Sequence, residues 1–242
     1  MTAFATVDYA KRDDGIAVLT LNRPASLNAF NIQMRDNVYE VLTAVHEDPD
    51  VRGLLVMGAG ERAFCAGADL SEFGTAPSQA IARQVRFERD IWGLWLSMPK
   101  PTVAAIHGYC LGSGIEIAIA CDIRIAADSA TFGMPELGLG LIPAAGGTQL
   151  LPRLLGSGRA LDLLLSGRRF TAGEALRYGL VTQVVTPVDL EATAIAILLD
   201  ILHAPSPALA AAKRAVSEGQ DLALPQAMAL ERRLAGTLAT IA

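Results

Sequence analysis

One stretch near the middle of the chain limits the folds that this sequence can adopt. Residues 99–126 read PKPTVAAIHGYCLGSGIEIAIACDIRIA. The apolar run at 103–107 predicts a strand, and a glycine-flanked turn leads into a short helix that is almost wholly apolar. A further strand is expected at 123–126. Strands that alternate with helices in this way indicate an α/β fold. The short helix has so few polar side chains that it must be buried in a large core.

A single carboxylate interrupts this apolar helix. Glu116 is costly to bury in its charged form without a partner. One interpretation is local: Ser113 to Glu116 reads S-x-x-E, a capping box in which the glutamate reaches back to the first amide of the helix. A second carboxylate, Glu136, lies before another glycine-rich apolar stretch and is not explained by capping. Two such carboxylates suggest an acid and base pair, with pKa values pushed apart by repulsion and desolvation.

The composition excludes several other classes of protein. Apolar residues make up 52% and charged residues 19% of the 242 residues, and the net charge of −5 argues against a nucleic-acid partner. No uncharged apolar run reaches the roughly 18 residues of a membrane span, and no secretory signal follows Met1. The three cysteines form no CxxC pair, which favours reduced thiols in the cytoplasm. The three histidines lack metal-ligand spacing, so no metal site is expected.

The remaining pattern predicts a core followed by a helical region. Strands are expected at 5–9, 16–21 and 53–58, helices at 31–46 and 77–96, and a loop at 61–70. From about residue 187 the chain is rich in alanine and leucine and is broken only by prolines. We therefore divide it into a core at 1–190 and a C-terminal helical region at 191–242.

Two loops share a design that suits the binding of an anion. Residues 61–70, ERAFCAGADL, and the turn at 111–114 carry small side chains where the backbone turns after an apolar run. Small residues allow a ligand to approach backbone N–H groups, and a helix N-terminus adds a positive potential. Two such loops that faced each other would form an oxyanion hole. Either loop alone could also be no more than a tight turn.

Four stretches occur in an order that resembles a known family. They are NRPASLNAF at 22–30, FCAGADL at 64–70, GYCLGSGIEIAIACDIRIA at 108–126 and FGMPELGLGLIPAAGGTQ at 132–149. Together they resemble the enoyl-CoA hydratase/isomerase (crotonase) superfamily, from about Phe4 to the end of the chain. The resemblance implies a crotonase-like α/β spiral of ββα units, related to that of caseinolytic proteases, with a C-terminal helical region. It also implies a homotrimer, or a hexamer built from two trimers.

The resemblance also implies the residues of a site. The oxyanion hole falls on the backbone N–H groups of Ala68 and Ser113, and the catalytic carboxylates fall on Glu116 and Glu136. Pro143 and Ala144 fall where the family lines its water site and acyl pocket. No separate cofactor is implied, because coenzyme A is part of the acyl-CoA substrate. The predicted CoA and substrate contacts are Ser26, Leu27, Ala66, Gly67, Ala68, Asp69, Leu70 and Gly112.

The function implied is that of an enoyl-CoA hydratase, a lyase of fatty acid β-oxidation. Water would add in syn fashion across the C2=C3 bond of a trans-2-enoyl-CoA, with Glu116 as the base and Glu136 as the proton donor. One alternative is a Δ3,Δ2-enoyl-CoA isomerase or another crotonase-type enzyme, and another is a non-catalytic acyl-CoA-binding protein. Three features depart from the family: Ser113 replaces a common glycine, Ala144 replaces a glycine of the family's IPGAGG pattern, and members usually continue into one more charged helix after Ala242.

Overall fold

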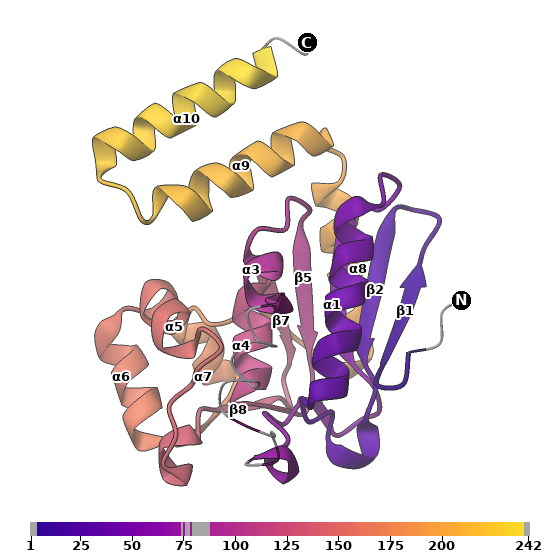
Figure 1. Cartoon of the computed structure of the whole chain (residues 1–242), viewed down its shortest axis with the longest axis vertical. Helices are drawn as coiled ribbons and strands as arrows, with labels where there is room; N and C mark the ends of the chain where they lie inside the picture. Colours follow the sequence, from indigo (N-terminus) through magenta and orange to yellow (C-terminus); the bar gives the residue numbers. More distant parts are fainter. Residues whose placement is uncertain (1–3, 74, 76–77, 79–87, 240–242) are drawn as a thin grey trace.

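Two β-sheets form the centre of the molecule, and helices pack around them (Figure 1). The computed structural model describes residues 4–73, 75, 78 and 88–239. The larger sheet has the order β1-β2-β3-β5-β7-β10; β1 is antiparallel to β2, and all other neighbours are parallel. Its strands are β1 (Val7–Lys11), β2 (Ile16–Leu21), β3 (Gly53–Gly58), β5 (Thr102–Ile106), β7 (Ile123–Ala127) and β10 (Gln183–Val185).

The smaller sheet has the order β4-β6-β8-β9, with only the last pair antiparallel. Its strands are β4 (Ala63–Cys65), β6 (Tyr109–Leu111), β8 (Thr131–Gly133) and β9 (Arg169–Thr171). Along the chain, β3 is followed by β4, β5 by β6, and β7 by β8, so each pair supplies one strand to each sheet. This repetition confirms the predicted spiral. The prediction of a continuous loop at 61–70 is wrong, because its buried residues 63–65 form β4.

The other predicted strands are close to the observed ones. Those at 16–21 and 53–58 agree with the structure, those at 5–9 and 103–107 are shifted by two residues and one residue respectively, and that at 123–126 is one residue short. The helix predicted at 77–96 lies largely outside the described residues. Within its last part a separate helix, α3 (Ile91–Leu96), begins after Asp90, whose side chain accepts a hydrogen bond from the Gly93 amide.

Two helices cover opposite faces of the large sheet. The apolar spacing predicted for 31–46 is confirmed in α1 (Ile32–Glu47), which buries Met34, Val38 and Val41 in the main core. Helix α8 (Leu190–Ile201) buries Leu190, Ala194 and Leu198 in a second cluster with side chains of β3, β5 and β7. The division predicted at residue 190 therefore falls at the start of a helix that packs on the sheet.

The last two helices lie together at one end of the molecule (Figure 1). They are α9 (Ser206–Gly219) and α10 (Leu224–Ala239). Lys213 on α9 joins them to the core, since its Nζ lies 2.7 Å from Asp122 Oδ2 and donates to the Lys100 carbonyl. In the described part of the chain no single helix could cross a membrane; Pro187–Ile201 and Ser206–Gly219 pass that test only as a pair bent by 102°.

The remaining helices surround the smaller sheet and the turns that follow its strands. They are α4 (Ser113–Ala120), α5 (Gly147–Leu155), α6 (Ser157–Ser166) and α7 (Ala172–Tyr178), with 3-10 turns η1 (Pro24–Ser26), η2 (Leu70–Glu72), η3 (Glu136–Leu139) and η4 (Pro187–Asp189). Helix α4 packs against β4, β6, α3 and α5. Except for its first residue, its side chains are buried.

Candidate active site

Three glycines bring the two predicted loops into contact. A methyl group added at Gly114 would lie 2.2 Å from the carbonyl oxygen of Cys65, and one added at Gly67 would lie 3.2 Å from that of Leu111. Gly112 has φ +51°, and a methyl group added there would lie 3.7 Å from the Cα atom of Gly67. Only glycine allows this approach of two backbones. The loop after β4 and the turn before α4 therefore lie side by side, as the sequence predicts.

Each loop presents an amide that the fold leaves unused. Ser113 is the first residue of α4, where an N–H group has no acceptor inside the helix. The backbone groups on either side of the Ala68 N–H group are bonded within the protein, because Asp69 N donates to Phe30 O and Gly67 O accepts from Phe30 N. Neither Ala68 N nor Ser113 N donates to any acceptor within the described residues. Both predicted oxyanion donors are thus available to a ligand.

Glu116 is held by the loop before α5. It is only 2% exposed, and its Oε1 accepts hydrogen bonds from Ala145 N at 2.8 Å and Gly147 N at 2.9 Å. The capping-box interpretation is wrong: the N-cap of α4 is Gly112, without a side-chain bond, and Glu116 N donates to Gly112 O. Two amide donors favour a charged carboxylate and fix its orientation.

Glu136 opens η3 and turns its carboxylate toward the same place. Its Oε1 would lie 2.6 Å from a methyl group added at Gly112, next to the Ser113 amide. Its Oε2 is buried and has no hydrogen-bond partner among the residues that the structure describes. Burial raises the pKa of Glu136 above that of an ordinary glutamate, and the nearby charge of Glu116 raises it further. The surroundings of the two carboxylates therefore differ: two amides favour the charged form of Glu116, whereas burial disfavours the charged form of Glu136.

The loop after β4 is fastened to residues of the NRPASLNAF stretch. Ala66 N donates to Leu27 O, so that amide is not available to a ligand. Arg23 Nη1 lies 2.9 Å from Asp69 Oδ2. The hydrogen bond from Ser71 and this guanidinium lower the pKa of the Asp69 carboxyl. Two other residues predicted to contact CoA lie in the 3-10 turns of these two segments. Ser26 is the last residue of η1, and Leu70 is the first residue of η2, with 55% of its surface exposed.

The loop at 143–147 contains residues that the sequence did not single out. Pro143 is buried and contacts Gly147, whereas Ala144 is exposed. The amides that donate to Glu116 belong to Ala145 and Gly147, further along the same loop. The AAGG sequence was a usable signal, because a chain of small residues near a buried carboxylate offers its backbone donors.

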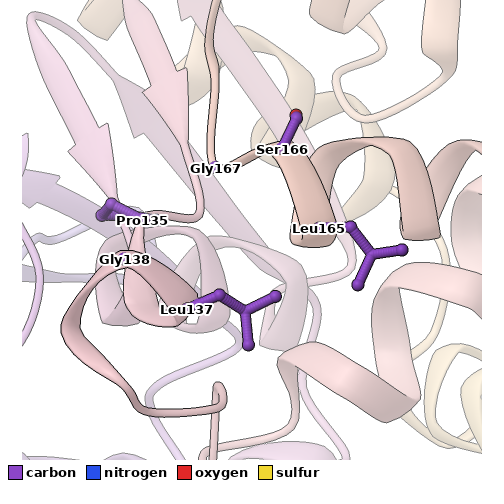
Figure 2. Close-up of a pocket in the computed structure, with 6 residues that line it drawn as sticks. All are labelled: Pro135, Leu137, Gly138, Leu165, Ser166 and Gly167. Carbon is purple, nitrogen blue, oxygen red and sulfur yellow. The ribbon is translucent and has the colours of Figure 1, made fainter.

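A surface depression lies beside η3 (Figure 2). It has a volume of about 380 Å³, and Leu137 and Leu165 face each other across it. Its lining is completed by Pro135, Gly138, Ser166 and Gly167, and does not include Glu136. No three His, Cys, Asp or Glu side chains of the described residues gather as a metal site.

The fold and the site together define a class of protein. Two unpaired amides on touching loops can stabilise a negative charge on a carbonyl oxygen, and two carboxylates beside them can move protons. These amides and carboxylates lie on a spiral in which each successive pair of strands contributes one strand to each sheet. This is the architecture of the crotonase superfamily.

Comparison with known proteins identifies the family. The family model for enoyl-CoA hydratase/isomerase matches residues 11–240. Crotonyl-CoA hydratase of Syntrophomonas wolfei is 38% identical over 91% of this chain and 85% of that protein. Short-chain-enoyl-CoA hydratase of Clostridium acetobutylicum is 38% identical over 93% of this chain and 87% of that protein. The crystal structure of enoyl-CoA hydratase from Bacillus anthracis superposes with a TM-score of 0.90, at 38% identity, covering 96% of this chain and 90% of that one. The chain belongs to the enoyl-CoA hydratase/isomerase family.

Proposed function

We propose that the protein is an enoyl-CoA hydratase that converts a trans-2-enoyl-CoA into a 3-hydroxyacyl-CoA. The observation that carries this proposal is the pairing of Glu116 with Glu136 beside the amides of Ala68 and Ser113. Relatives named crotonyl-CoA hydratase and short-chain-enoyl-CoA hydratase support it. Isomerisation needs only one carboxylate to carry a proton between C4 and C2, so the second carboxylate favours hydration.

The site suggests how each group would act. The thioester oxygen accepts hydrogen bonds from Ala68 N–H and Ser113 N–H, which stabilise the negative charge that grows there during addition. Glu116, held as a carboxylate, takes a proton from water while the water oxygen bonds to C3. Glu136, whose pKa is raised by burial, gives its proton to C2. The C2=C3 double bond is replaced by C3–O and C2–H bonds, and proton exchange with solvent restores both carboxyl groups.

The same proposal extends to the setting of the enzyme. We place CoA along the loop at 66–70 and the residues after the NRP segment, which are joined by backbone hydrogen bonds.

The cysteines and the C-terminal helices suggest where the enzyme works and how it assembles. Three buried free thiols suit a reducing compartment such as the cytoplasm. Exposed apolar side chains on the C-terminal helices, including Val216, Leu224 and Met228, support a trimer or hexamer. Light scattering with size-exclusion chromatography measures that assembly.

Crotonyl-CoA with the purified protein tests the activity. Hydration removes the absorbance of the conjugated enoyl thioester and adds the mass of one water to the product. A trans-3-enoyl-CoA is the matched substrate for isomerisation, which creates that absorbance without a change in mass. Binding of both thioesters without turnover of either would contradict the proposed function and would favour an acyl-CoA-binding protein.

A further inference from the structure

Two neighbouring residues of the NRPASLNAF stretch have an unusual backbone. Leu27 and Asn28 both have φ +54°, and they are the non-glycine residues with positive φ in the described chain. A left-handed conformation is unfavourable for residues with a side chain, and least so for asparagine. Such a pair persists only where the surrounding structure holds it, so the bend at 27–28 is expected to have a purpose.

The side chain of Asn28 holds this bend. It is fully buried, and its Oδ1 accepts from Arg23 N at 2.9 Å. Its Nδ2 donates to Ala59 O at 2.9 Å and to Ala63 O at 2.7 Å. The first bond closes the bend on itself, and the other two tie it to both sides of the turn between β3 and β4. One amide side chain therefore fixes the bend against the strand that leads into the loop at 66–70.

The bend in turn fixes the backbone on both sides of Ala68. Leu27 O accepts from Ala66 N at 3.0 Å, Phe30 N donates to Gly67 O at 2.8 Å, and Phe30 O accepts from Asp69 N at 3.0 Å. The Ala66 and Asp69 N–H groups and the Gly67 carbonyl are thus committed to residues 27–30, whereas the Ala68 N–H group donates to no acceptor within the described residues. The position of the Ala68 N–H group depends on where residues 27–30 lie.

We infer that Asn28 is a positioning residue for the Ala68 oxyanion donor. Its role rests on the proposed function, because the donor matters only if a thioester carbonyl is polarised there. Asn28 reaches no substrate atom in this proposal. It acts through the backbone of residues 27–30, and its loss lets the Ala68 amide move relative to the Ser113 amide.

Asn28→Ala tests the inference with two readouts. A displaced donor weakens stabilisation of the transition state more than binding of the CoA portion, so kcat should fall about 10- to 100-fold while KM changes less than about 3-fold. The second readout is the absorbance of a bound para-dimethylaminocinnamoyl thioester of CoA, which moves to longer wavelength when its carbonyl is polarised. In the variant this shift should shrink at saturating protein.

Asn31→Ala is the matched control. Asn31 lies three residues further on and also uses its side chain on the backbone, accepting from Met34 N at 2.8 Å as the N-cap of α1. Its removal should lower the melting temperature but leave kcat and the absorbance shift unchanged, because it is not bonded to the loop at 66–70. If Asn28→Ala does not fold, Asn28→Gly allows the left-handed backbone while removing the three bonds, and the same two losses are expected.

The outcomes separate the two proposals. A folded Asn28 variant with wild-type kcat and a wild-type absorbance shift would overturn the positioning role. Equal losses in Asn28→Ala and Asn31→Ala would overturn it as well, because they would show a general effect of stability. A wild-type protein that does not hydrate crotonyl-CoA contradicts the proposed function instead, and the absorbance shift still reports whether Asn28 places the Ala68 amide.

Discussion

Replacement of Glu116 by glutamine separates the chemical role of this residue from its structural one. Glutamine keeps the length of the side chain and an oxygen that can accept from the Ala145 and Gly147 amides. It cannot take a proton from water. General-base catalysis by a positioned group contributes about 10²- to 10⁴-fold, so kcat for hydration should fall by about that factor.

The stability of two variants gives the second half of this prediction. In Glu116→Ala both amides lose their acceptor, and an unsatisfied buried donor costs about 1–3 kcal/mol, so the free energy of unfolding should fall by about 2–6 kcal/mol. In Glu116→Gln the bonds remain and a buried charge is removed. These effects oppose each other, and the change should stay within about 1.5 kcal/mol.

Urea unfolding and the crotonyl-CoA assay measure these quantities on the same preparations. The expected pattern is a strong loss of activity in both variants and a strong loss of stability in the alanine variant alone. Near-normal kcat in Glu116→Gln would refute the role of Glu116 as the base. Equal destabilisation by glutamine and alanine would show that the two amide bonds do not hold the side chain.

Four further predictions follow from contacts in and around the site. Gly112→Ala should reduce kcat at least about 10-fold, because its methyl group would meet the carboxylate of Glu136 and its φ is +51°; this is measured in the hydration assay, and full activity would contradict the geometry. The raised pKa of Glu136 means that the folded protein binds its proton more tightly than the unfolded chain does, so stability falls as pH rises above the ordinary glutamate pKa. Glu136→Gln should therefore be more stable than the wild type at pH 8 by urea unfolding, with a difference that shrinks toward pH 4; the reverse trend would contradict the assignment. Burial raises the pKa of the Cys65 thiol to about 12, so iodoacetamide at pH 8 should label it only after unfolding, as mass spectrometry can show. Lys213→Met should lower the free energy of unfolding by about 1 kcal/mol through loss of its ion pair with Asp122, whereas its effect on the rate of hydration should be small.

The sequence predicts the parts of the fold that local patterns encode. The strands at 16–21 and 53–58 and the buried face of α1 follow from runs and spacings of apolar residues. Strand β4 was missed because only three residues, lying among loop-like neighbours, form it, and pairing with β6 rather than local propensity decides their conformation. The position of α8 on the sheet is likewise decided by tertiary packing and not by local sequence, because its composition resembles that of the helices that follow it.

The site shows the same limit at the level of single contacts. The sequence indicates both carboxylates and both loops, but the capping box was the wrong local partner for Glu116. Its real partners lie 29 and 31 residues further along the chain. The left-handed backbone at Leu27 carries no local signal either, because leucine rarely adopts it and the bonds of Asn28 that hold it come partly from residues more than thirty positions away.

The contact between the two loops also bears on how this protein could acquire new reactions. The proposed oxyanion donors, the N–H groups of Ala68 and Ser113, belong to the main chain, and glycines 67, 112 and 114 allow their loops to lie in contact. Side-chain replacement at 116 or 136 changes the proton chemistry and leaves those donors in place. A library varied only at these two positions would therefore explore other conversions of activated thioesters while the part of the site that is hardest to rebuild is inherited unchanged.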